Sequence, residues 1–151
     1  MGSLTLPPDG LVYIDASSLT YSVERLEPYR TLLEPMCQEA QDGNIRLVSS
    51  PILVVEALVK PLREGNVAIE MQYRELFGAG AVRLLDASYQ VFEDAARLRA
   101  TSGLKTPDAT HAATALGAAC TLFVTNDSDF RRVQELPVTV LDDVLVEDAP
   151  R

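Results

Sequence analysis

Short apolar segments alternate with longer amphipathic segments along almost the whole chain of 151 residues. The apolar segments are rich in β-forming residues and are therefore expected to be strands. They cover residues 11–14, 45–48, 81–85, 121–125 and 138–141. Strands separated by helical segments indicate βαβ units. The sequence thus predicts an α/β fold, a three-layer α/β/α sandwich with a mostly parallel sheet of about five strands.

Helical periodicity and capping residues predict what lies between the strands. The expected helices cover about 17–41, a segment opened by Ser50-Pro51, about 66–77, 89–102, and a segment opened by Thr106-Pro107. Proline lacks a backbone N–H, so the first of these is expected to be interrupted near Pro28 and Pro35. Gly103 suits the end of the fourth helix.

Length and composition fit one domain with a core of its own, since 47% of the residues are hydrophobic. We expect an N-terminal lead-in over residues 1–10, a single domain over 11–141 and a C-terminal tail over 142–151.

Cysteine usage and hydropathy indicate the compartment. Cys37 and Cys120 lie far apart and lack metal-ligand spacing, so they are expected to be free thiols in a reducing compartment. No apolar run approaches the roughly 18 residues of a membrane span, and the start of the chain does not resemble a secretory signal. We therefore expect a cytoplasmic protein without a membrane partner.

The formal net charge of −9 argues against a module that binds nucleic acid mainly by neutralising phosphates. An acidic chain suits a protein whose carboxylates hold divalent cations. The alternative is that the acidity only keeps the protein in solution.

Four carboxylates are expected at one edge of the sheet. Asp15 and Asp127 follow the first and fourth strands, so they lie at the carboxyl edge. Asp108 opens the helix that leads back into the fourth strand, and Glu56 lies early in the helix after the second strand. Both helices must begin at the carboxyl edge, which is where such sheets bind ligands.

Each acid also has a purely structural interpretation. Asp15 could cap a helix, Asp108 could interact with a helix dipole, and Asp127 could belong to a turn. Glu56 could pair with Lys60, four residues on. The apolar residues on both sides of Glu56 instead indicate a buried helix, in which a carboxylate needs partners.

Four neighbouring carboxylates cannot all stay ionised without compensation. Oxygen ligands without clustered His or Cys suit Mg²⁺ or Mn²⁺. These ions can activate water and stabilise a transferring phosphoryl group, so the suggested chemistry is phosphodiester hydrolysis.

Four segments resemble, in order, the acidic motifs of PIN domains: "YIDASSL", "SSPILVVEALV", "LKTPDATHAATAL" and "LFVTNDSDF". The resemblance is closest to VapC-type ribonuclease toxins of toxin–antitoxin pairs and covers about Leu11 to Leu141. It implies a parallel sheet flanked by helices and a Mg²⁺- or Mn²⁺-dependent endoribonuclease that cleaves RNA with a metal-activated water. It also implies a homodimer and a small antitoxin with a basic tail, which would suit an acidic surface.

The resemblance assigns roles by motif. The catalytic acids would be Asp15, Glu56, Asp108 and Asp127, of which Asp15, Asp108 and Asp127 would hold the metal. Thr125 matches the hydroxyl residue before the last acid, and Asp129 matches a less constant, supporting acid.

Several other residues can be interpreted either as part of the site or as purely structural. Ser17 could orient Asp15 or cap the helix. His111, the only histidine, is expected to be a capped or solvent-facing helix residue rather than part of the site. Lys105, Arg131 and Arg132 could meet RNA phosphates at the rim, but solvated surface charge is the simpler interpretation. Phe130 is expected to be a core residue that anchors its turn.

Two other functions are considered. A non-catalytic PIN-fold module that binds or regulates a partner would keep the fold without the activity. A receiver-type phosphoacceptor domain also carries acids at strand ends, but it requires an acidic pair near the first strand and a lysine after the last. Asp15 stands alone, and no lysine follows residue 141.

Overall fold

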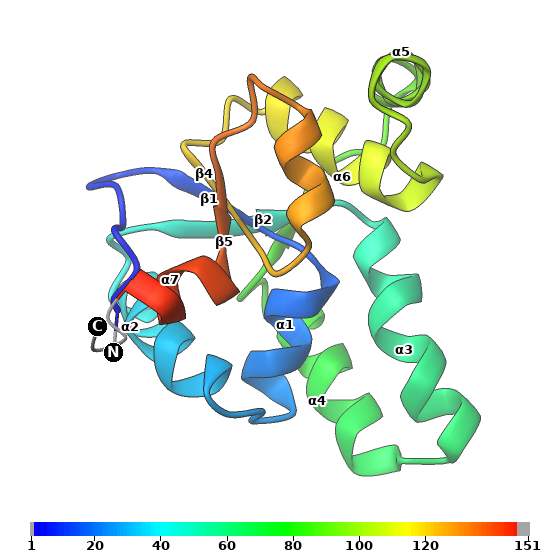
Figure 1. Cartoon of the computed structure of the whole chain (residues 1–151). Helices are drawn as coiled ribbons and strands as arrows, with labels where there is room; N and C mark the ends of the chain where they lie inside the picture. The colour runs from blue at the N-terminus through cyan, green and yellow to red at the C-terminus, as the bar shows by residue number, and fades with distance from the viewer. Residues whose placement is uncertain (1, 148–151) are drawn as a thin grey trace.

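The computed structural model describes residues 2–147, in which five short strands form one parallel sheet (Figure 1). The strands are β1 (Leu11–Ile14), β2 (Arg46–Ser49), β3 (Arg83–Leu84), β4 (Leu122–Thr125) and β5 (Val138–Val140). They lie in the order β3-β2-β1-β4-β5, and each neighbouring pair is parallel. The predicted α/β fold with a parallel sheet is confirmed.

Seven α-helices and one 3₁₀ helix surround the sheet in the described part of the chain. They are α1 (Ala16–Val23), α2 (Tyr29–Gln41), α3 (Ile52–Glu64), α4 (Val67–Gly78), α5 (Tyr89–Ser102), α6 (Thr106–Gly117), η1 (Ser128–Arg132) and α7 (Leu141–Glu147). Several ends follow the expected chemistry. Asn66 caps α4 by accepting from the Ile69 backbone N–H at 3.2 Å, and Gly103 ends α5 with a φ of 72°.

Two details of the predicted elements differ. Pro35 lies inside α2 and does not interrupt it, because burial of Leu32, Leu33 and Met36 on one face outweighs one lost backbone hydrogen bond. Strand β3 has only two residues and is an edge strand that pairs with β2 alone.

Side-chain alternation along the strands builds two apolar layers. Val12 and Ile14 of β1 belong to a core that includes residues of α1, α2, α3, α4 and α7. Tyr13, between them, belongs to a second core with residues of α5 and α6. Helices therefore cover both faces of the sheet, as a parallel sheet requires.

Residues 142–147 were assigned to a tail from the sequence, but they form most of α7. Leu141 and Val144 are buried in the same core as β1 and α2, so this face of α7 is packed against the domain. Polar contacts add to the packing, because Tyr29 of α2 donates to the Asp142 carboxylate at 2.6 Å.

Strand register positions the carboxyl edge. Ile14 of β1 pairs with Val124 of β4, so the next residues, Asp15 and Thr125, lie side by side. The carboxyl edge thus receives a buried hydroxyl next to a carboxylate.

Cys37 and Cys120 are free thiols, as expected, and burial raises the pKa of the Cys120 thiol to about 11. Within residues 2–147, no helix combines the length and the apolar character that crossing a bilayer requires.

The packing of α7 is tested by Val144→Ala, with Val146→Ala as a matched control on the same helix. Val144 is 7% exposed and Val146 is 70% exposed. We expect Val144→Ala to lower the free energy of unfolding by about 1.5 kcal/mol or more, and Val146→Ala by less than about 0.5 kcal/mol. Urea unfolding measures both, and equal small effects would mean that α7 is not part of the cooperative domain.

Candidate active site

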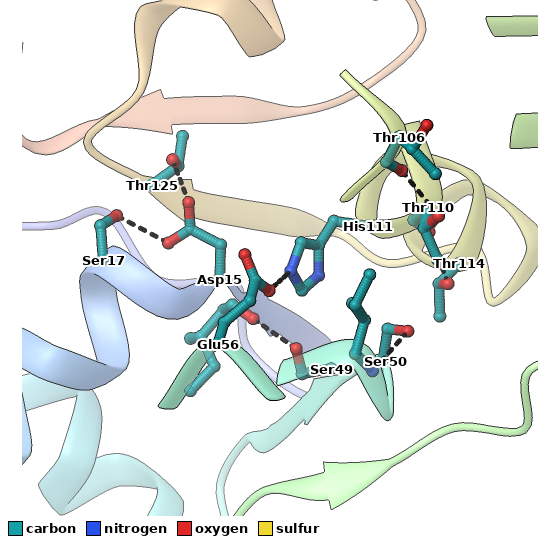
Figure 2. A network of polar contacts seen from close by, with 12 residues as sticks. Asp15, Ser17, Ser49, Ser50, Glu56, Thr106, Thr110, His111, Thr114 and Thr125 are labelled. Atoms are coloured by element: carbon teal, nitrogen blue, oxygen red, sulfur yellow. Dashed lines mark hydrogen bonds and ion pairs between the residues drawn. The ribbon is translucent and has the colours of Figure 1, made fainter. Parts of the chain in front are cut away.

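Asp15 is buried at the junction of β1 and α1, where both of its carboxylate oxygens are engaged. Oδ1 accepts from the Ser17 hydroxyl at 2.8 Å and from the Ser18 backbone N–H at 3.2 Å. Oδ2 accepts from the Thr125 hydroxyl at 2.5 Å (Figure 2). Asp15 is thus a helix N-cap, and it is also fixed in orientation by hydroxyls from two elements. Ser17 acts on the carboxylate, which was one of its two interpretations.

Burial raises the pKa of the Asp15 carboxyl, while the hydrogen bonds from Thr125, Ser17 and Ser18 oppose this shift. The pocket therefore stabilises the carboxylate by directed donors in surroundings that disfavour charge.

The loop after β4 is tied to the same residues. Thr125 accepts from the Asp127 backbone N–H at 3.0 Å while its hydroxyl donates to Asp15. The Asn126 backbone N–H donates to the Ser17 hydroxyl at 3.1 Å. Asp127 then caps η1, since its Oδ1 accepts from the Asp129 backbone N–H at 2.9 Å. This network holds the Asp127 backbone in a defined position beside Asp15.

Asp129 and the basic residues of η1 lie at the surface. The Asp129 carboxylate accepts from the Arg132 guanidinium at 3.2 Å, and Arg131 contacts Asp143 of α7. Phe130 is buried and packs on Phe123 with ring centroids 4.6 Å apart, which confirms it as the core residue of this turn. Lys105 is exposed at the start of α6.

Asp108 lies in the first turn of α6, and the charges of the other three acids affect the pKa of its carboxyl. Burial raises the pKa of the Asp108 carboxyl, and the negative charges of Asp127, Glu56 and Asp15 raise it further. His111 acts in the opposite direction. Asp127, Glu56 and Asp15 therefore lie close enough to Asp108 for their negative charges to add to burial in raising the pKa of its carboxyl.

Glu56 extends from α3, and the expectation that this helix is buried is wrong. The helix is not buried all round, because it buries only the stripe that contains Leu53, Ala57 and Leu58. Val55 on another side is 61% exposed, and the Glu56 side chain is 27% exposed. A periodic stripe suffices to anchor a surface helix, so apolar residues beyond it need not be covered.

The partner of Glu56 is His111 and not Lys60. Lys60 lies 3.9 Å from Glu24 of the α1 C-terminus, whereas Glu56 Oε1 lies 2.5 Å from His111 Nε2 (Figure 2). His111 is 1% exposed, so the expectation of a solvent-facing residue is wrong. The α6 face that bears His111 points into the protein because Ala109, Ala112 and Ala113 allow close packing there.

Two further residues at the site were not identified from the sequence. Tyr13 of β1 contacts His111 Nδ1 through its hydroxyl at 2.6 Å. The Asn126 side chain donates to the Tyr21 hydroxyl at 3.1 Å and accepts from the Asp142 backbone N–H at 2.9 Å. A tyrosine within an apolar strand was the available signal for Tyr13, since a buried hydroxyl requires a partner.

A divalent cation needs several oxygen ligands that converge on one point. Among residues 2–147, no three His, Cys, Asp or Glu side chains are close enough together to hold a metal ion as they lie. The chemistry of the donors nevertheless fits Mg²⁺ or Mn²⁺, because they are carboxylates without competing sulfur ligands. The negative charges of Asp127, Glu56 and Asp15, which add to burial in raising the pKa of the Asp108 carboxyl, are charges that a cation would neutralise.

Solved structures with the same fold include toxins in complex with antitoxins. VapBC2 from Rickettsia felis, bound to a promoter DNA fragment, matches with a TM-score of 0.64 and 18% identity over 86% of this chain and 98% of that chain. A toxin–antitoxin complex from Klebsiella pneumoniae matches with a TM-score of 0.63 and 19% identity over 85% and 96%. PAE2754 from Pyrobaculum aerophilum matches with a TM-score of 0.60 and 15% identity over 92% and 96%.

No curated protein sequence matches this chain. The family model described as the PIN domain matches residues 12–136, a range that contains the four acids, the hydroxyls that orient Asp15, and His111. This protein therefore belongs to the PIN domain family.

Proposed function

We propose that this protein is a divalent-metal-dependent endoribonuclease that hydrolyses RNA phosphodiester bonds, and that it is the toxin of a toxin–antitoxin pair. The observation that carries the proposal is the electrostatic coupling of Asp108 to three other carboxylates at the carboxyl edge of the sheet. Such a concentration of negative charge destabilises a protein unless a bound cation neutralises it.

Asp15, Asp108 and Asp127 would hold the Mg²⁺ or Mn²⁺ ion. When bound, the ion would activate a water molecule and offset negative charge on the phosphoryl group. Without it, the acids would repel the RNA backbone. The ion is thus needed for substrate to approach as well as for the reaction.

The protein's own contribution is preorganisation. Thr125 and Ser17 donate to different oxygens of Asp15, so this carboxylate is already oriented before a ligand arrives. Asp127 is held by backbone hydrogen bonds of its loop. Glu56 is the fourth catalytic acid in this proposal and can accept a proton from the attacking water. Asp129 has a supporting role, because its backbone N–H donates to Asp127.

A small antitoxin protein with a basic tail is the proposed partner. Two observations support it: the net charge of −9, and fold neighbours that are themselves toxin–antitoxin complexes. We further propose that the protein acts in the cytoplasm as a homodimer, with a domain that begins near residue 11. Free thiols and RNA as substrate are consistent with that location.

The direct test is RNA cleavage by variants of the acids. We expect Asp15→Asn, Asp108→Asn and Asp127→Asn each to lower kcat by about 100-fold or more in Mg²⁺ or Mn²⁺, because each removes a charge from the site. Asp42→Asn, an exposed acid at the other edge of the sheet, is the matched control and should leave kcat unchanged. Rates are measured on single-stranded and structured RNA. Full activity in the Asp15 and Asp127 variants would refute the nuclease assignment, and metal binding without cleavage of any RNA would favour a binding module.

The raised pKa of Asp108 predicts a pH-dependent stability of the metal-free protein. In the folded state this carboxyl holds its proton to higher pH than in the unfolded chain, where the ordinary value is 3.8. The contribution of Asp108 to the free energy of unfolding is therefore fully present below pH 3.8. It is lost as the pH rises through the raised pKa of the folded state. We expect metal-free Asp108→Asn to gain melting temperature over the wild type between acidic and neutral pH. A difference in melting temperature that stays constant at all pH values would show that the pKa of Asp108 is not raised in the folded protein.

Cation binding should reverse this order of stability. A ligand that binds only the folded state at 100 times its Kd adds about 2.7 kcal/mol. We expect Mn²⁺ to raise the melting temperature of the wild type and of Asp42→Asn, but not that of Asp108→Asn. The melting temperatures are measured by calorimetry. An equal rise in all three proteins would indicate that Mn²⁺ binds elsewhere.

A further inference from the structure

His111 lies on one element and contacts two others, and each of the three either carries an acid or ends next to one. It lies on α6, one turn after Asp108. Its Nε2 lies 2.5 Å from Oε1 of Glu56 on α3, and its Nδ1 lies 2.6 Å from the hydroxyl of Tyr13, two residues before Asp15 on β1. Figure 2 shows the imidazole beside the Glu56 carboxylate, in the same region as Asp15.

The hydrogen-bond roles follow from what each group can do. An ionised carboxylate can only accept, so the bond to Glu56 requires a proton on Nε2 of His111. In a neutral imidazole Nδ1 is then an acceptor, which requires Tyr13 to donate. A tyrosine hydroxyl carries a proton near neutral pH and can donate it in this bond of 2.6 Å.

Tyr13 is itself immobile. It is fully buried in β1, and its ring stacks on Phe123 of β4 with centroids 4.9 Å apart and planes within 5°. The imidazole meets the Tyr13 ring edge-on, with centroids 5.6 Å apart. The Tyr13 hydroxyl thus provides a fixed point from which the orientation of His111 is determined.

Glu56, by contrast, has no such support from its own helix. Its side chain is 27% exposed on a helix whose neighbouring Val55 faces solvent. A glutamate in this position has several rotamers open to water. The contact with His111 selects the rotamer that faces the other acids.

We propose that His111 is a positioning residue, which Tyr13 orients and which holds the Glu56 carboxylate at the catalytic edge. The inference rests on the proposed nuclease function for its effect on rate, but the Tyr13–His111–Glu56 connection can be tested without it. One imidazole would join β1, α3 and α6, and so would fix the relative position of three acids that are distant in sequence.

The kinetic test uses variants that keep either the contact with Glu56 or the contact with Tyr13. His111→Gln places an amide donor near the position of Nε2, whereas His111→Asn is too short to reach Glu56. We expect His111→Asn to lower kcat by about 10- to 100-fold with little change in KM, and His111→Gln to retain most of the activity. Tyr13→Phe keeps the ring stack but loses the hydroxyl, and should lower kcat less than His111→Asn.

A double-mutant cycle separates positioning from a general structural role. If His111 acts through Glu56, then His111→Asn should cause no further loss of kcat in a Glu56→Ala background. Tyr13→Phe should likewise have no further effect there. Multiplied losses in the double variants, or equal losses for His111→Gln and His111→Asn, would overturn the proposal.

A second measurement does not depend on activity. Because His111 is the only histidine, ¹⁵N NMR of the imidazole gives one unambiguous set of signals. Near neutral pH we expect a proton on Nε2 of the wild type, and a shifted Nε2 signal in Glu56→Ala. An unprotonated Nε2, or a signal unaffected by Glu56→Ala, would disprove the connection. If the wild type cleaved no RNA while these signals appeared as expected, the nuclease proposal would fail and the connection would stand.

Discussion

Electrostatic repulsion among the carboxylates at one edge of the sheet is the constraint on which the rest of the site depends. Burial and then this repulsion raise the pKa of Asp108, and burial raises that of Asp15. At Asp15 the fold opposes this shift, since the Ile14–Val124 pairing sets Thr125 beside Asp15 and allows a hydrogen bond of 2.5 Å. Keeping such charges together lowers stability, and under the proposed function a bound cation would offset this loss.

Contacts that hold the acids in place come from both faces of the sheet. On one face, Ser17 of α1 and the loop after β4 hold Asp15 and Asp127. On the other, Tyr13 and Phe123 form a rigid aromatic stack that supports His111. Helix α7 reaches the same loop through Asn126, so the C-terminal helix also contributes to the edge where the acids lie.

The sequence was sufficient where a site residue follows directly from a strand end or a helix start. Asp15 and Asp127 could be located because parallel strands share a carboxyl edge, and Asp108 because its helix must run opposite to β4. The sequence was insufficient where a contact joins distant segments. The partner of Glu56 depends on how α3 and α6 pack, so neither the Lys60 pairing nor a solvent-facing His111 could be excluded. The length of β3 and the packing of α7 also depend on tertiary neighbours that local pattern does not reveal.

The most direct test of the central claim is a crystal structure grown or soaked with Mn²⁺, with anomalous diffraction recorded to locate the ion. If these acids hold the metal, one or more anomalous peaks are expected at the carboxyl edge of the sheet, ligated by carboxylate oxygens of Asp15, Asp108 and Asp127. Mn²⁺ bound only elsewhere, with these three carboxylates unliganded at saturating concentration, would contradict it.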